Sequence, residues 1–292
     1  MGISRRALLA GGLATGLAAG GATYALIEAS LLPGKYQLAR ILGACGTDPA
    51  LPSVTPGRVL MSRFHSAYRR REVEMAIMLP PGLHRTLPVT LVLHGLTSSA
   101  RDAVTLGYPW FLAAGQLRPM ALVAVDGGST TYWHPRANGD NPLGMLVNEV
   151  VPLLAQRGFS VSRVGVAGWS MGGYGALLLA STLGQRHCFA AAVLSPAIFG
   201  SYAGAHAANP DAFDSAADFA ANDVLTSPRL PALRRIPVRI DCGTDDPFGP
   251  RAAVLRTALG NPPGSVSSGC HDAGFWRRHI PAQLEFISAH LP

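Results

Sequence analysis

One stretch near the middle of the chain constrains the fold more than any other: residues 164–177, VGVAGWSMGGYGAL. Its apolar start, Val164 to Ala167, predicts a buried strand, and the Ala- and Leu-rich residues 176–183 predict a helix. Between them lies a Gly-x-Ser-x-Gly turn centred on Ser170. In this strand–turn–helix context the turn is typical of a nucleophile elbow, which exposes the serine hydroxyl above a sheet. The stretch therefore makes Ser170 a candidate nucleophile.

Short apolar runs alternate with helical patterns on both sides of this turn. We expect strands at about 73–79, 89–93, 120–125, 164–167, 189–194, 236–242 and 265–268, and helices at 141–154, 176–183, 250–259 and 276–290. This alternation indicates an α/β protein with a mainly parallel central sheet and helices on both faces. Residues 200–235 are longer than an ordinary connection, so we expect them to form a cap or one wall of a pocket.

The composition favours one folded domain behind an N-terminal segment. Hydrophobic residues make up 48% of the 292-residue chain, which argues against a disordered protein. Without the N-terminal segment roughly 250 residues remain, enough to bury the core of one large domain. We expect an export signal or membrane anchor at 1–30, a Gly- and Pro-rich linker at 31–60 and a catalytic domain at 61–292.

The N-terminus has the pattern of an export signal. Ser4-Arg5-Arg6-Ala7-Leu8-Leu9 is typical of a twin-arginine signal, and residues 7–27 carry no charge. As a helix this apolar run would extend ~32 Å, about the thickness of a bilayer core, so it could also associate with a membrane. The best cleavage motif, Ile27-Glu28-Ala29, is weak, so cleavage and retention as an anchor both stay open. Either way we expect the domain outside the cytoplasm: extracellular, in the cell envelope, or anchored in the cytoplasmic membrane and facing outward.

The net charge of +7 does not point to a particular macromolecular partner. A basic surface would favour an anionic envelope, but a coding bias toward Ala, Gly and Arg explains the charge more simply. No basic run is interleaved with aromatic residues, so we expect no nucleic-acid partner. The sequence has no Gly-rich phosphate loop and no zinc-type Cys/His spacing, so we expect neither a cofactor nor a metal. It predicts no particular oligomeric state.

Two loops after the elbow offer the partners that a nucleophilic serine needs. A serine hydroxyl is a poor nucleophile at neutral pH, so it needs a base, and the base needs an orienting carboxylate. The loop after the strand at 236–242 offers Asp245 and Asp246, and the next loop after a strand offers His271. In a parallel sheet such loops gather at the carboxyl edge of the strands. The order Ser, Asp, His along the chain is that of the α/β-hydrolases.

The elbow GWSMGGYGAL, residues 168–177, resembles that of the esterase D family of α/β-hydrolases, which includes S-formylglutathione hydrolases, feruloyl-type esterases and mycolyltransferases. The resemblance covers about residues 70–290 and includes Leu93-His94-Gly95-Leu96, Glu149, Gly243-x-x-Asp246 and His271 followed by Phe275-Trp276. It implies an α/β-hydrolase fold and an ester-cleaving activity.

The resemblance also implies the catalytic roles. Ser170 would be the nucleophile, and His271 the general base and then the general acid. Asp246 would orient His271; it is preferred to Asp245 because the family's acid follows the loop glycine by three positions, and Asp241 is a further candidate.

The remaining parts of the expected site surround the nucleophile. The oxyanion hole should use the backbone N–H groups of Met171, which follows the serine, and Leu96, on the loop after an early strand. Trp169, Tyr132 and Trp133 are candidates for lining the acyl or alcohol pocket, although aromatic core packing explains them equally well.

Four cysteines allow three pairings. Cys242 ends one expected strand and Cys270 follows the next, so a Cys242–Cys270 disulfide would brace the acid and base loops in an oxidising compartment. A Cys45–Cys188 bond is a weaker hypothesis, and buried free thiols are the alternative to both.

The leading interpretation is a serine carboxylesterase that acts on a small-molecule or lipid ester through an acyl-Ser170 intermediate. The second is an acyltransferase on the same residues, with an envelope sugar or lipid as acceptor. Mycolyltransferases have an elbow similar to Gly-x-Ser-Met-Ala-Gly and use a glutamate as the acid that orients the histidine. This chain has Gly172 and Asp246 at these positions, which favours hydrolysis. The third is a catalytically silent surface-binding protein, which the presence of serine, aspartate and histidine argues against.

Overall fold

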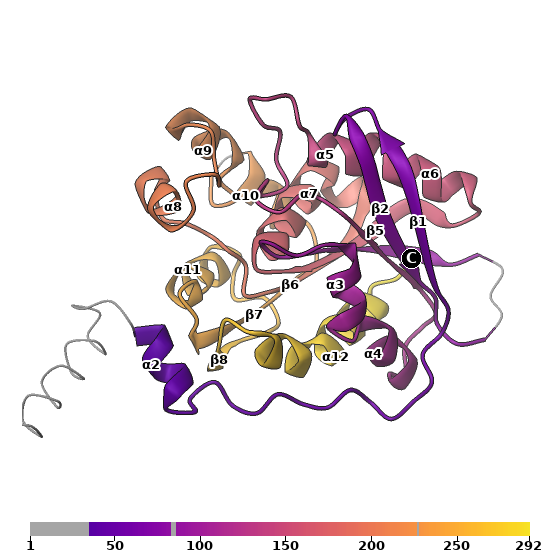
Figure 1. Ribbon diagram of the computed structural model, residues 1–292, viewed down its shortest axis with the longest axis horizontal. Helices are drawn as coiled ribbons and strands as arrows, with labels where there is room; N and C mark the ends of the chain where they lie inside the picture. Colours follow the sequence, from indigo (N-terminus) through magenta and orange to yellow (C-terminus); the bar gives the residue numbers. More distant parts are fainter. Residues whose placement is uncertain (1–34, 83–85, 227) are drawn as a thin grey trace, which may run out of the picture.

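The computed structural model describes residues 35–82, 86–226 and 228–292 (Figure 1). Its strands are β1 (Val59–Ser66), β2 (Arg71–Met78), β3 (Pro88–Leu93), β4 (Ala121–Val125), β5 (Ser160–Trp169), β6 (Cys188–Leu194), β7 (Val238–Asp245) and β8 (Val266–Cys270). Its helices are α2 (Lys35–Ile41), α3 (Ala100–Thr105), α4 (Tyr108–Ala114), α5 (Pro142–Met145), the π-helix η1 (Leu146–Val150), α6 (Val151–Gln156), α7 (Met171–His187), α8 (Tyr202–Ala208), α9 (Ala216–Asn222), α10 (Arg229–Leu233), α11 (Gly249–Ala258) and α12 (Ala273–Ala289).

The described strands form one eight-stranded sheet in the order β1-β2-β4-β3-β5-β6-β7-β8. From β4 through to β8 each strand runs parallel to its neighbour, whereas β2 is antiparallel to both β1 and β4. This arrangement confirms the predicted α/β-hydrolase fold. The parallel strands bring the loops that follow β3, β5, β7 and β8 to one edge of the sheet.

Helices cover both faces of the sheet because side chains alternate along each strand. On β2, Val73, Met75 and Ile77 pack with α5, α6 and α7, whereas Ala76 and Met78 pack on the opposite face with α3, α4 and α12. In Figure 1, α12 lies beside α4 across the lower part of the molecule. The two buried layers hold the strands, and thus the loops at their ends, in fixed positions.

The insertion after β6 forms three short helices, α8, α9 and α10, which gather at one side of the sheet (Figure 1). The hydroxyl of Tyr174 on α7 donates a 2.7 Å hydrogen bond to the carbonyl of Asn222, at the end of α9. Phe199, Ala208 and Asn209, from the first part of the insertion, border the cavity that contains Ser170. The insertion therefore forms one wall of the pocket.

Besides the helices of the insertion, four elements are additional to those expected from the sequence: β1 and the helices α2, α3 and α4. Strand β1 begins at Val59, inside the predicted linker, and its residues alternate between exposed and partly buried, a weak signal for an edge strand. Helix α2 also lies within the predicted linker at 31–60. The expected helix at 141–154 is divided into α5, η1 and α6, with Pro152 in the first turn of α6.

The predicted signal or anchor at 1–30 lies outside the described residues. Among the residues that are described, no helix is both long and apolar enough to span a bilayer. The assignment of that segment stays a prediction, as do the domain boundaries.

Candidate active site

The turn after β5 holds Ser170 in a backbone conformation that few residues adopt. Its φ of 56° and ψ of −123° lie in the positive-φ region. The turn is tight because a Cβ on Gly168 would lie 2.3 Å from the Gly172 carbonyl oxygen, and a Cβ on Gly172 would lie 2.0 Å from that of Leu93. Only glycine fits at these two positions, so the sequence forces the serine into the sharp turn.

The side chains of Ser170, His271 and Asp246 form a continuous hydrogen-bonded series. His271 Nε2 lies 2.8 Å from Ser170 Oγ, and His271 Nδ1 lies 2.8 Å from Asp246 Oδ2. These three residues come from the loops after β5, β7 and β8, where the sheet topology brings them together. The geometry is that of a serine, a base that can accept its proton, and a carboxylate that orients the base.

Asp246 is buried and charged, which suits it to orient a histidine. Burial opposes ionisation, but the hydrogen bond and charge of His271, together with the 2.8 Å bond from the Phe248 N–H, outweigh it, so the pKa of Asp246 is lowered. Neither of the alternative acids reaches His271: Asp245 accepts from the Thr244 hydroxyl, and Asp241 pairs with Arg239 at 2.8 Å. Of the three candidate acids, the structure thus places Asp246 in contact with His271, and not Asp245 or Asp241.

The predicted oxyanion N–H groups both lie next to the serine and are free. Met171 begins helix α7, so its N–H has no partner within the helix. Leu96 borders the same cavity as Ser170. Within the described part of the chain, neither N–H donates a hydrogen bond. Both donors remain available for an oxygen atom of a bound ester.

The cavity around Ser170 has a volume of about 330 Å³ and a largely aromatic lining. Six of its lining residues are Leu96, Tyr132, Trp169, Phe199, Phe248 and Trp276. Burial raises the pKa of Tyr132 to about 12, so its hydroxyl stays protonated at neutral pH. The indole N–H of Trp169 has no hydrogen-bond partner among the described residues, which leaves it free to donate to a bound molecule.

A second, smaller cavity of about 180 Å³ shares Ser98, Trp169 and Trp276 with the first. It continues toward Asp102 and Arg277. The two indole rings therefore border both cavities, and of the two cavities the larger is the one lined by Ser170 and His271.

Trp133 does not line either cavity, so its assignment as a pocket residue was wrong. Its side chain is fully buried, and its indole N–H donates to the His94 carbonyl at 3.2 Å. A Cβ on Gly127 or Gly175 would collide with the ring, which shows how closely the backbone packs around it. Trp133 and Tyr132 are neighbours in sequence and both are buried in the same apolar cluster, but of the two only Tyr132 also borders the cavity.

The cysteine pairing also differs from the expectation. Cys270 forms a disulfide with Cys45, and Cys242 and Cys188 are buried free thiols. Strands β7 and β8 are neighbours, as predicted, but their register puts Cys242 opposite Val266, four residues before Cys270. The two sulfurs are therefore too far apart along the strands to bond, and the predicted Cys242–Cys270 and Cys45–Cys188 bonds do not form.

Among the described residues, one group of potential metal ligands comes together: Cys45, Cys270 and Asp272. Its two sulfurs are joined in the disulfide, so they are not the thiolates that bind a metal. The group is explained as a covalent cross-link.

Sequence reasoning missed most of the pocket wall. Phe199 and Phe248 lie just after β6 and β7, and Trp276 lies in the first turn of α12. Their common signal is position, because each follows a parallel strand within a few residues and so falls at the carboxyl edge of the sheet.

Comparison with known proteins places this geometry in context. Residues 66–261 match the family described as "Putative esterase". No curated protein matches the chain.

Several solved structures share the fold at low sequence identity. The chain is similar to a ferulic acid esterase (TM-score 0.69, 19% identity, covering 81% of this chain and 100% of that one). It is also similar to an S-formylglutathione hydrolase from Agrobacterium tumefaciens (TM-score 0.67, 18% identity, covering 83% of this chain and 99% of that one). A third similar structure is MPT51 from Mycobacterium tuberculosis (TM-score 0.62, 19% identity, covering 82% of this chain and 100% of that one).

Proposed function

Because the chain belongs to the Putative esterase family and is a serine esterase, we propose that it hydrolyses carboxylic esters through a covalent acyl-Ser170 intermediate. One observation carries the proposal: Ser170 Oγ, His271 and Asp246 are joined by two hydrogen bonds of 2.8 Å beside an aromatic cavity. This arrangement supplies the nucleophile, the base and the orienting carboxylate that acyl transfer needs.

In the first half of the reaction, Ser170 Oγ attacks the ester carbonyl carbon while His271 Nε2 takes the hydroxyl proton. The carbonyl oxygen becomes an oxyanion, which the N–H groups of Leu96 and Met171 stabilise. Asp246 stabilises the imidazolium and holds its Nδ1–H. The C–O bond to the alcohol then breaks, and the imidazolium gives its proton to the leaving alcohol.

In the second half, water attacks the acyl carbon and His271 takes one of its protons. Collapse of the new tetrahedral species breaks the bond to Ser170 Oγ, which takes the proton back from His271. The products are a carboxylic acid and the free serine. Each half uses the same base and the same oxyanion donors.

The shape of the cavity favours a short apolar or aromatic group. A volume of about 330 Å³, bordered by Tyr132, Phe199 and Phe248, is too small for a long unfolded alkyl chain and too apolar for a charged one. We infer that small aromatic or short aliphatic groups occupy it.

Acyl transfer to another alcohol is the second candidate function. The observation in its favour is the adjoining cavity of about 180 Å³, which could hold an acceptor alcohol beside the acyl-enzyme. Adding candidate alcohols to the assay separates the two functions. A new ester that forms with the acceptor supports transfer, whereas release of acid alone supports hydrolysis.

We further propose that the domain works outside the cytoplasm. The Cys45–Cys270 disulfide supports this, since such bonds persist in oxidising compartments. N-terminal sequencing of the protein isolated from its native membrane and culture medium tests the proposal. A start near residue 30 in the medium supports cleavage, an intact N-terminus in the membrane supports anchoring, and an intact cytoplasmic protein contradicts export.

A p-nitrophenyl ester series of increasing acyl length tests the activity. We expect the wild type to hydrolyse short esters fastest and Ser170→Ala to lose activity. Ser181→Ala is the matched control, because Ser181 lies on the same helix and its hydroxyl contacts only the Leu178 carbonyl and the Arg229 guanidinium among the described residues, none of them in the catalytic series. Full activity in Ser170→Ala would refute the nucleophile. Failure of a fluorophosphonate probe to label the wild type would favour a silent binding protein.

A further inference from the structure

His94, at the end of β3, is a fully buried histidine with a partner on each ring nitrogen. Its Nε2 accepts a 2.9 Å hydrogen bond from the Gly127 N–H, and its Nδ1 lies 2.9 Å from the Gly95 carbonyl oxygen. A backbone N–H can only donate and a carbonyl oxygen can only accept. Since the Gly127 N–H occupies Nε2, with Asp126 Oδ1 3.5 Å from the same nitrogen, the Nδ1–H is the group that donates to the Gly95 oxygen.

The Gly95 carbonyl belongs to the same peptide unit as the Leu96 N–H. In a trans peptide the C=O and N–H bonds point in opposite directions, so fixing one fixes the other. The bond from His94 holds the Gly95 oxygen on the core side, with a further bond from the Ser98 N–H at 3.3 Å. The Leu96 N–H must then face away from the core, toward the cavity that contains Ser170.

Among the described residues, His94 and Ser98 are the two that hydrogen-bond to this peptide unit. The turn is exposed at Thr97, which adopts a φ of 58°, and Thr97 bonds the Ser129 carbonyl through its N–H at 2.9 Å. That contact fixes the next peptide and leaves the Gly95–Leu96 unit to His94 and Ser98. A flip of the unit would turn a carbonyl oxygen toward the developing oxyanion and remove one donor.

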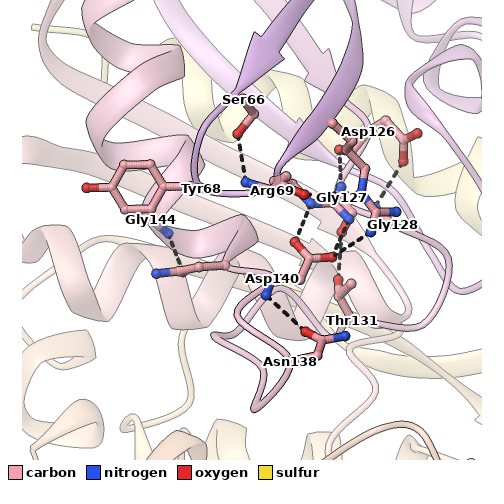
Figure 2. A network of polar contacts seen from close by, with 12 residues as sticks. Ser66, Tyr68, Arg69, Asp126, Gly127, Gly128, Thr131, Asn138, Asp140 and Gly144 are labelled. Carbon is pink, nitrogen blue, oxygen red and sulfur yellow. Dashed lines mark hydrogen bonds and ion pairs between the residues drawn. The ribbon is translucent and has the colours of Figure 1, made fainter.

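The loop of residues 126–128, which bonds His94 through the Gly127 N–H, is itself held in place by a buried arginine. Figure 2 shows Arg69 between Asp140 and the loop of Asp126, Gly127 and Gly128. The buried Arg69 guanidinium makes two bonds to the Asp140 carboxylate, at 2.7 and 2.8 Å, and donates to the Asp126 carbonyl at 2.7 Å. The Gly127 N–H thus approaches His94 from a rigid base.

We propose that His94 is a positioning residue that holds the Gly95–Leu96 peptide with its N–H in the oxyanion hole. The inference rests on the proposed function, because it concerns the same tetrahedral intermediate. In this role His94 never touches the substrate. The Nδ1–H of its imidazole orients the peptide by donating to the Gly95 carbonyl oxygen. Its effect belongs to the transition state, since a ground-state carbonyl needs the donor less than an oxyanion does.

Two substitutions separate this role from simple packing. His94→Phe keeps a ring in the buried site but removes both hydrogen bonds. His94→Asn places an amide N–H near the former Nδ1 and so keeps the donor to Gly95. His134→Phe is the matched control, because His134 is equally buried and bonds two carbonyls at 2.9 Å, those of Pro135 and Ala212, away from the oxyanion loop.

Each variant is tested for kcat, KM, melting temperature and inhibition by a phenylboronic acid, which forms a tetrahedral adduct with a nucleophilic serine. We expect His94→Phe to lose roughly 100-fold in kcat with KM within about threefold, the usual effect of one lost oxyanion donor. The boronic acid should bind correspondingly more weakly. His94→Asn should recover at least tenfold in kcat, and His134→Phe should lose melting temperature but keep kcat within about threefold.

The inference is overturned if His94→Phe keeps kcat and boronic-acid affinity near the wild-type values. It is also overturned if His94→Asn folds but recovers neither kcat nor affinity for the boronic acid relative to His94→Phe. If His94→Phe fails to fold, the comparison of His94→Asn with the wild type still decides. Because His94→Asn keeps the donor to the Gly95 carbonyl, we expect it to bind the boronic acid with wild-type affinity. A loss of affinity above tenfold in His94→Asn would contradict the inference. Loss of all activity in Ser170→Ala alongside unchanged His94 variants would reject the inference and leave the proposed function standing.

Discussion

Removing the Cys45–Cys270 disulfide should lower the stability of the domain by an amount that its loop length sets. The bond joins residues 225 positions apart, so the chain-entropy relation gives an upper value of about 5 kcal/mol. Native disulfides contribute about 2–5 kcal/mol, and about 3 °C of melting temperature follows each kcal/mol in a domain of this size. We therefore expect Cys45→Ala to melt roughly 6–15 °C below the wild type.

The catalytic residues should tolerate this loss better than the fold does. The segment at Cys45 is also held by Arg278, which donates to the Cys45 carbonyl at 2.7 Å, and by the 2.8 Å pair of Arg277 with Asp48. Because these contacts remain, His271 should stay in place at low temperature. We expect kcat at 20 °C to change by less than about threefold.

Thermal melts with and without dithiothreitol provide the assay. The reductant should lower the melting temperature of the wild type and leave that of Cys45→Ala unchanged. Cys242→Ala is the control, because Cys242 is a free thiol and its variant should keep the full response to reductant. If Cys45→Ala keeps the response and Cys242→Ala loses it, the pairing described here is wrong. Equal melting temperatures for Cys45→Ala and the wild type would show that the disulfide does not stabilise the domain.

Three further predictions concern the site. Asp246→Asn should lower kcat by about 10³–10⁴-fold, measured on a p-nitrophenyl ester, because the amide holds His271 in the wrong tautomer; a loss below tenfold would contradict its role. The pKa of Asp246 is lower in the folded protein than its value of about 4 in the unfolded chain. Its charge therefore stabilises the fold at pH values above about 4, and this contribution is lost as the pH falls through the pKa of the folded state. Urea unfolding should therefore show a gap between wild type and Asp246→Asn that is constant above about pH 5 and narrows below about pH 4; a gap that widens in acid would refute the sign. Trp169→Phe removes the unpartnered indole N–H, so KM should rise about 3–10-fold for esters with an oxygen atom near the scissile bond and stay unchanged for simple alkyl esters; equal effects on both would show that the ring acts only by packing.

The sequence predicted the central part of the fold because local geometry allows few alternatives there. Gly168 and Gly172 touch neighbouring backbone atoms, so their positions mark the tight turn at Ser170 directly. The parallel strands are apolar on both faces, and their order fixes which loops meet. The contacts among Ser170, Asp246 and His271 follow from that topology.

Other features depend on registers and side-chain directions that the sequence does not encode locally. The disulfide partner of Cys270 is set by the offset between β7 and β8 and by a long segment before β1. Tyr132 and Trp133 both have positive φ, an unusual pair of conformations; both rings are buried in the core, and only that of Tyr132 also borders the cavity. Sequence spacing alone would treat the two aromatic residues alike.

The structure also changes how His94 is understood. From the sequence it is a histidine in the oxyanion loop with no assigned task. Its partners, the Gly127 N–H and the Gly95 carbonyl, come from loops that only the folded sheet brings together.

The most direct test of the account is to find where an acyl group becomes attached. The wild type is mixed with a p-nitrophenyl ester, quenched in acid within the first turnover, digested and sequenced by tandem mass spectrometry. We predict that the mass of the acyl group appears on Ser170 and on no other residue, and that His271→Ala fails to acquire it on the same timescale. An acyl group on a different side chain, or turnover without any acylated peptide, would contradict the covalent mechanism.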